Sequence, residues 1–334
     1  MLAAAARVAR TGWPTVVCGT AIVFGSFLGL VVPQANVVAG RMIDPTVLTL
    51  VALLFFDVRF GRLKLLATAP RLIGIAWLAN FVVIPTIAFA ITSLFLSGSP
   101  LLFTGVMIYL VAPCTDWFLG FTRMAGGNRD LGAVLLPINM VTQLALYPGV
   151  LWLFAREQIP ANPEGNVQVV LQWLVAPAMV AITARLLMQK VLQPTVFRRI
   201  EIIVGRLIPV TIAILIVEIF ASNVTVIADD FGSFWPVLAA VFTFFVVTYF
   251  AGEALAQVFR FEYPERALLV MTTSARNAPL MLALTVVALP DQPVIYAAII
   301  MGMLIEFPHL TVITQVLLGR RRASENRVEA AVLT

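Results

Sequence analysis

Long apolar segments dominate this sequence, and the stretches between them carry most of the charged residues. Ten such segments can be distinguished, at residues 13–33, 43–58, 71–96, 101–122, 131–155, 167–189, 205–223, 233–258, 266–289 and 293–318. Most are close to the roughly 20 residues that a helix needs to cross a bilayer. Backbone groups without partners are costly in hydrocarbon, so such segments have to be helical. The sequence therefore predicts an all-α membrane protein with ten transmembrane helices.

Composition and charge placement support this prediction. Charged residues make up 12% of the chain, against about 25% in a soluble domain. Cytoplasmic loops of membrane proteins are enriched in Lys and Arg. If the N-terminus is cytoplasmic, 19 of the 22 Lys and Arg residues fall in cytoplasmic loops or at cytoplasmic helix ends, and the other three are Arg41, Arg156 and Arg276. We therefore expect a multi-pass protein of the plasma membrane with both termini cytoplasmic. The basic residues flank apolar segments, so the expected partner is the lipid bilayer and not nucleic acid; no pattern indicates the oligomeric state.

The sequence contains a weak internal repeat. Pro113-Cys114-Thr115-Asp116 interrupts the fourth segment, and Ser274-Ala275-Arg276-Asn277-Ala278-Pro279 interrupts the ninth. A shift of 160 residues superposes Cys114 on Ser274 and Tyr147-Pro148 on Phe307-Pro308. The two halves are residues 1–160 and 161–320, and 321–334 form a polar cytoplasmic tail. Each half has five spans, an odd number, so the second half starts on the opposite side of the membrane and has the inverted orientation. Inverted repeats with broken helices are typical of secondary transporters, whose substrate site lies where the breaks meet. We therefore expect broken helices 4 and 9 to cross at the core.

Asp116, Arg276 and Glu306 lie inside predicted spans, and a charge at the bilayer centre costs about 2.5–3.5 kcal/mol on insertion scales. Asp116 and Arg276 occupy matched repeat positions, so we expect a charge pair at the core, which could simply hold the two halves together. Glu306 lies in the middle of the tenth span, where burial disfavours its ionised form. It is either a group that binds and releases protons or a hydrogen-bonded structural carboxyl.

Cys114 follows Pro113 directly within the first break. A buried membrane cysteine is usually a small inert side chain. Here, however, nearby helix ends can favour the thiolate, and soft sulfur prefers thiophilic partners.

Short motifs around these residues resemble those of a known family. Ala112-Pro113-Cys114-Thr115 resembles the cysteine motif of the arsenite-efflux permeases, within the bile acid/arsenite/riboflavin transporter superfamily. Leu304-Ile305-Glu306-Phe307-Pro308 is similar to their glutamate motif, and Pro137-Ile138-Asn139 matches their asparagine. The resemblance implies a ten-helix fold with a panel and a core domain, exporting trivalent arsenite, or the related antimonite, in exchange for protons. It implies that Cys114 contacts the metalloid and that Glu306 handles the proton. The substrate-binding residues are then Cys114, Thr115, Asn139, Ser274 and Asn277.

The ninth segment favours an alternative function. Ser274 to Pro279 resembles the sodium/bile-acid branch, whereas arsenite permeases carry an acidic residue where this chain has Pro279. The alternative is a sodium-coupled symporter of an organic anion. In either case Arg276 could supply a fixed positive charge where a sodium-coupled relative binds a cation. The chain has one histidine and no phosphate-binding loop, so neither an enzyme nor an ATP-driven pump is expected, and no cofactor.

Overall fold

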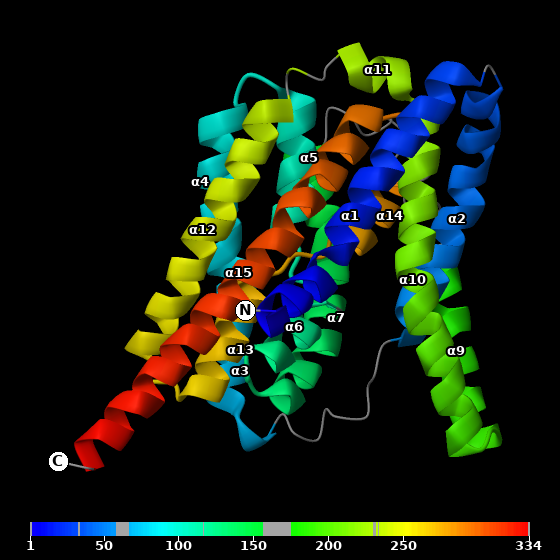
Figure 1. The fold of residues 1–334 in the computed structure, drawn as a ribbon. Coiled ribbons are helices and arrows are strands. Elements are labelled where there is room, and N and C mark those ends of the chain that lie inside the picture. The colour runs from blue at the N-terminus through cyan, green and yellow to red at the C-terminus, as the bar shows by residue number, and fades with distance from the viewer. Residues whose placement is uncertain are drawn as a thin grey trace.

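The computed structural model describes residues 2–32, 34–57, 67–115, 117–155, 175–229, 232 and 234–332, with side chains described between 16 and 322. In these ranges the elements are helices (Figure 1). In chain order they are α1 (Leu2–Val31), α2 (Ala35–Asp57), α3 (Pro70–Leu78), η2 (Ala79–Val83), α4 (Ile84–Leu96), α5 (Pro100–Val111), α6 (Phe118–Met124), α7 (Arg129–Phe154), α9 (Ala176–Val191), α10 (Pro194–Ser222), α11 (Val224–Asp229), α12 (Phe234–Val258), α13 (Tyr263–Ser274), α14 (Ala278–Ala288) and α15 (Pro293–Val332).

Several of these helices have the length and apolar character of membrane spans. Six qualify within the described residues: Ala35–Asp57, Pro70–Leu96, Arg129–Phe154, Pro194–Ser222, Phe234–Val258 and Pro293–Arg322. Three shorter apolar helices are Val16–Val31, Pro100–Val111 and Ala278–Ala288. The predicted all-helical, multi-pass membrane class is therefore confirmed. The full set of ten spans in two inverted repeats stays a prediction, and residues 167–174 of the sixth segment lie outside the described residues.

Two predicted spans are interrupted where the sequence predicts a break. The fourth divides into α5 and α6, and the ninth divides into α13 and α14. Pro113 cannot donate a backbone hydrogen bond, so it ends the helical ladder. In the second break, the side chain of Asn277 caps α14 by accepting from the N–H of Leu280, and Pro279 lies in the first turn, where its missing N–H does no harm.

The helices pack in two groups (Figure 1). Helices α1, α2, α9 and α10 form one group, and α4, α5, α12, α13 and α15 belong to the other; α1 lies against α15, and α2 against α14. Within the first group, α1 approaches α10 through Gly25 and Gly29. A Cβ atom at these positions would lie 2.6 Å from the carbonyl oxygen of Val217 and 2.4 Å from that of Ala221. This spacing is the small-xxx-small pattern by which membrane helices approach closely.

Some charged side chains within the described ranges form ion pairs between helices. Arg185 of α9 donates to the carboxylate of Glu201 on α10 over 2.6 Å. The carboxylate of Glu253 on α12 accepts from both Arg266 and Arg320. Helix α15 itself continues to Val332, so the segment predicted as a polar tail is helical over most of its length.

Candidate functional site

The two helix breaks are bonded to each other through their backbones. The N–H of Cys114 donates to the carbonyl oxygen of Ala275 over 3.1 Å, and the N–H of Asn277 donates to that of Ala112 over 3.0 Å. Together they form an isolated antiparallel β-bridge. Each break leaves backbone groups without helical partners, and the other break satisfies part of them. The crossing predicted from the repeat is therefore present in the structure.

Polar side chains of the predicted site gather at this crossing. The side-chain amide of Asn277 donates to the hydroxyl oxygen of Thr115 over 2.8 Å, which adds a side-chain link between the breaks. Ser274 is fully buried at the end of α13, and its hydroxyl has no hydrogen-bond partner among the described residues.

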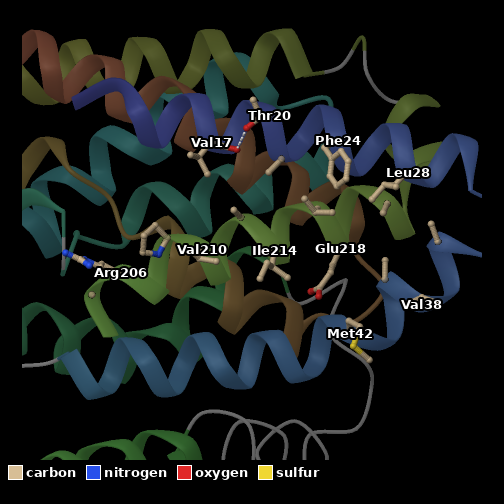
Figure 2. A pocket seen from close by; sticks show the side chains of 18 residues that line it. Val17, Thr20, Phe24, Leu28, Val38, Met42, Arg206, Val210, Ile214 and Glu218 are labelled. Carbon is tan, nitrogen blue, oxygen red and sulfur yellow. Dashed lines mark hydrogen bonds between the residues drawn. The ribbon is translucent and has the colours of Figure 1, made fainter. Parts of the chain in front are cut away.

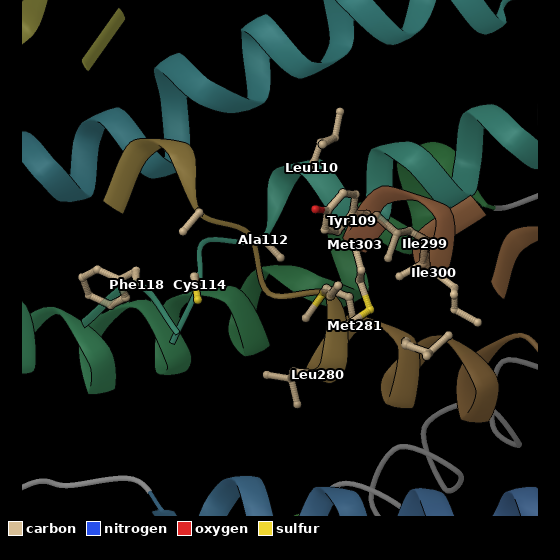
Figure 3. Close-up of a cluster of buried hydrophobic side chains, with 14 of the residues drawn as sticks. Tyr109, Leu110, Ala112, Cys114, Phe118, Leu280, Met281, Ile299, Ile300 and Met303 are labelled. Atoms are coloured by element: carbon tan, nitrogen blue, oxygen red, sulfur yellow. The ribbon is translucent and has the colours of Figure 1, made fainter. Parts of the chain in front are cut away.

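The thiol of Cys114 lies on the segment that joins α5 to α6 (Figure 3). Figure 3 shows Cys114 and Ala112 on this segment, beside the start of α14 with Met281. Cys114 is fully buried and is not in a disulfide. A soft sulfur atom is therefore held in the non-helical segment at which the two breaks are bonded.

Glu306 connects α15 to both breaks. One carboxylate oxygen, Oε2, accepts from the hydroxyl of Tyr109 on α5 over 2.7 Å. The other, Oε1, accepts from the backbone N–H of Arg276 over 2.9 Å. The Tyr109 ring reaches this position because residue 302 is glycine: a Cβ atom there would lie 2.3 Å from the ring. The structure therefore places the predicted proton-handling carboxyl group next to the second break.

Arg276 is fully buried, and its guanidinium group donates to backbone carbonyl groups. Nη1 donates to Leu110 over 3.2 Å, while Nη2 donates to Thr272 and Thr273 over 3.0 and 2.8 Å. The guanidinium also lies over the ring of Phe244, 5.7 Å from its centroid. Its predicted partner Asp116 lies outside the described residues, so the charge pair stays a prediction.

Asn139 is buried on α7, and its side-chain amide has no hydrogen-bond partner among the described residues. Gln143, one turn later, is also buried with both amide atoms unpaired in the same part of the chain. Gln143 lines a cavity of about 280 Å³ together with Ala112 of the first break and Met281 of α14. Amides that lack partners inside a protein are costly, so such positions point to a polar ligand or water.

Three residues near the crossing were not singled out from the sequence. Gln143 follows Asn139 by four residues, so a helical register would have placed both on one face. Tyr109 gave no signal, because a tyrosine within an apolar segment looks like any other packed residue. Asn80 lies in the π-helical turn η2 and donates to the hydroxyl of Thr272 over 3.0 Å. Such turns are frequent at functional sites.

Two further ionisable groups in the predicted spans, His309 and Glu218, are not part of the crossing. The ring of His309 stacks on Phe245, and its Nε2 lies 2.8 Å from the Phe245 carbonyl oxygen. Glu218 accepts from Thr46 over 2.9 Å and lines a groove of about 1020 Å³ between α1, α2 and α10 (Figure 2). That groove is mostly apolar and contains none of the predicted site residues, so it is separate from the crossing.

Comparison with known proteins gives a family and a relative. The model of the Sodium Bile acid symporter family (SBF) matches residues 46–230, which is more than half of the chain. The arsenical-resistance protein Acr3 of Corynebacterium glutamicum is 33% identical over 144 residues, which make up 41% of this chain and 39% of that protein. The matched region therefore spans about two fifths of the length of this relative.

The family match covers the residues that hold the cysteine motif, 112–115, and the asparagine motif, 137–139. The resemblance to the arsenite branch of the superfamily is confirmed by the relative, and a transporter rather than an enzyme is the class that the family match indicates. Because the family model covers more than half of its residues, this chain belongs to the Sodium Bile acid symporter family.

Proposed function

We propose that this chain exports trivalent arsenic, as arsenite or the related antimonite, in exchange for protons. The observation that carries the proposal is the buried thiol of Cys114 in the segment where the two helix breaks are bonded. A relative named for arsenical resistance supports it.

The chemistry of arsenite suits a single thiol. In neutral water arsenite is the uncharged acid As(OH)₃. When the Cys114 thiol reacts with it, a sulfur–arsenic bond forms and an arsenic–oxygen bond breaks. The thiol proton and the leaving hydroxyl group depart as water, and no atom changes oxidation state. Soft sulfur favours this exchange. The chain has two cysteines, so it cannot supply three thiolates to one arsenic atom, and the single bond allows release.

Polar groups around the thiol would hold the remaining hydroxyl groups of the substrate. We assign this role to Thr115, Asn139, Ser274 and Asn277, as the sequence predicts, and we add Gln143. Asn139, Ser274 and Gln143 carry buried polar atoms without partners in the described part of the chain, and these are suited to an uncharged ligand that both donates and accepts hydrogen bonds.

Glu306 would couple export to proton movement. Its carboxylate oxygens accept hydrogen bonds from the hydroxyl of Tyr109 and from the N–H of Arg276. Protonation would remove the charge that strengthens this bond, and a proton on Oε1 would in addition compete with the N–H of Arg276 for that oxygen. Protonation would thereby loosen the break from α15, which is a direct physical link between proton binding and the geometry of the site.

The transport cycle would use ten spans in two inverted repeats, 1–160 and 161–320. Cys114 is fully buried here, so the substrate reaches it only after the group of α1, α2, α9 and α10 moves relative to the rest, as in alternating access. The membrane would be the plasma membrane, with both termini cytoplasmic. Labelling of a single cysteine introduced at Thr334 tests this topology: reaction with an impermeant maleimide in intact cells would contradict it.

The export proposal is tested with Cys114→Ser in an arsenite-sensitive bacterial host. Cys18→Ser on α1 is the matched control, since Cys18 is also a buried thiol outside the crossing. At equal amounts of protein in the membrane, the Cys18 variant should protect cells and load everted vesicles with arsenite, whereas the Cys114 variant should do neither. Undiminished export by Cys114→Ser would refute the proposal.

The family match favours one second candidate, sodium-coupled symport of an organic anion. Uptake of a bile acid into vesicles, measured with and without an inward sodium gradient, distinguishes the two candidates. Uptake of a bile acid that requires sodium would support this candidate and would count against arsenite export.

A further inference from the structure

We propose that the guanidinium group of Arg276 is a tethered cation that permanently fills a carbonyl site at the crossing of the helix breaks. The chain then binds no free sodium ion at this position. The inference rests on the transporter function, because it excludes sodium as the coupling ion at this site. Its test involves neither arsenite nor Cys114.

The carbonyl groups around Arg276 belong to the ends of two half-helices. Leu110 lies one residue before the end of α5, and Thr272 and Thr273 are in the last turn of α13. The last four carbonyl groups of a helix have no partner within it. They also carry the negative end of the helix dipole. In membrane transporters, half-helix C-terminal ends and unwound carbonyl groups coordinate the coupling cation. Two such ends converge here.

The guanidinium group occupies the position that a free cation would take. Three hydrogen bonds of 2.8–3.2 Å join it to the carbonyl oxygens of Leu110, Thr272 and Thr273. The ring of Phe244 lies against it at 5.7 Å, and the residue is fully buried. Glu306 accepts from the backbone N–H of the same residue, so a carboxyl group adjoins the site. Oxygen donors of this kind are the usual ligands of hard cations.

A second cation would be repelled from this site. At about 4 Å and an effective dielectric constant of about 20, like unit charges repel strongly enough to weaken binding roughly a thousandfold. The carbonyl oxygens are also already engaged by the guanidinium. Removal of the guanidinium should reverse both effects and leave a carbonyl-lined space that a small cation can enter.

The test is thermal unfolding of the purified protein in lipid nanodiscs, followed by tryptophan fluorescence. Sodium chloride replaces choline chloride at constant total salt, for the wild type and for Arg276→Ala. The wild-type unfolding temperature should not change. The unfolding temperature of Arg276→Ala should be lower and should rise saturably with sodium. Millimolar guanidinium, which replaces the missing group, should raise it as well.

Ile299→Ala is the matched control for general destabilisation, because Ile299 is fully buried on α15 and uncharged. Its lowered unfolding temperature should respond neither to sodium nor to millimolar guanidinium. Sodium stabilisation of the wild type over choline would overturn the inference, and so would an Arg276→Ala variant that ignores both cations. Should Arg276→Ala fail to fold, Arg276→Gln takes its place, and the wild-type measurement stands on its own. Loss of the arsenite proposal through the Cys114 variants would leave these results unaffected.

Discussion

Removal of the hydrogen bond between Tyr109 and Glu306 should lower the unfolding free energy. The size of this loss depends on whether the carboxyl group of Glu306 is ionised. Tyr109→Phe removes one oxygen atom and keeps the ring in its place against Gly302, so no cavity is created. A hydrogen bond to a charged group contributes about 1.5–3 kcal/mol. Hydrogen bonds between membrane helices average about 0.6 kcal/mol and reach about 1.7. A loss of unfolding free energy above about 2 kcal/mol would exceed the range for neutral hydrogen bonds between membrane helices and lie within the range for charged groups. It would therefore indicate that Glu306 is ionised.

The assay is a double-mutant cycle with Tyr109→Phe and Glu306→Gln, measured by unfolding with SDS in mixed micelles. The effects of substitutions at independent sites on the unfolding free energy add to within about 0.3–0.5 kcal/mol. For this pair, we therefore expect a coupling energy clearly above about 0.5 kcal/mol. Tyr147→Phe is the matched control, since the Tyr147 hydroxyl lies 3.2 Å from that of Thr285 and not from a carboxyl group. It should show no coupling to Glu306→Gln.

Additivity of Tyr109→Phe and Glu306→Gln would show that the two side chains are not coupled. It would mean that the bond observed at 2.7 Å contributes nothing to the folded state, and Tyr109 would have no place in the site. Equal coupling for Tyr109 and Tyr147 would also contradict the prediction, because a general response of the membrane region would then explain both.

Three further changes test the packing and the crossing. Gly25→Val should force α1 away from α10 and lower the unfolding free energy by about 1–3 kcal/mol or more, whereas Gly74→Ala, with open space around it, should have little effect on thermal unfolding. Arg185→Ala should cost about 3–5 kcal/mol by removing a buried guanidinium that forms an ion pair with Glu201, and Glu201→Gln in the same chain should restore part of the loss. Asn277→Ala removes a helix cap and the side-chain bond to Thr115 in the first break, so arsenite accumulation in everted vesicles should fall more than the roughly 1 kcal/mol loss of stability explains.

The positions of the helix breaks could be predicted from the sequence, because proline and polar residues are conspicuous inside apolar segments. Pro113 and Arg276 were identified in this way, and the structure brings their segments together. A helix break is a local property, which depends on a missing N–H and on side chains that cap the next helix. Local properties of this kind can be read from neighbouring residues alone.

Partners across the fold could not be predicted in the same way. The bond from Tyr109 to Glu306 joins residues 197 positions apart and depends on how two helices are rotated about their axes. Gly25 and Gly29 show the small-xxx-small spacing in the sequence, but many glycine pairs do so without lying at an interface. The carbonyl groups around Arg276 give no signal in the side-chain pattern, because every residue has one.

In the proposed function, one thiol at the crossing of two helix breaks contacts the substrate. X-ray absorption at the arsenic edge, recorded on purified protein with stoichiometric arsenite, tests this contact directly. Arsenic should have one sulfur neighbour beside oxygen in the wild type and in Cys18→Ser, and oxygen neighbours alone in Cys114→Ser. Oxygen alone around arsenic in the wild type, or a sulfur neighbour that persists in Cys114→Ser, would contradict it.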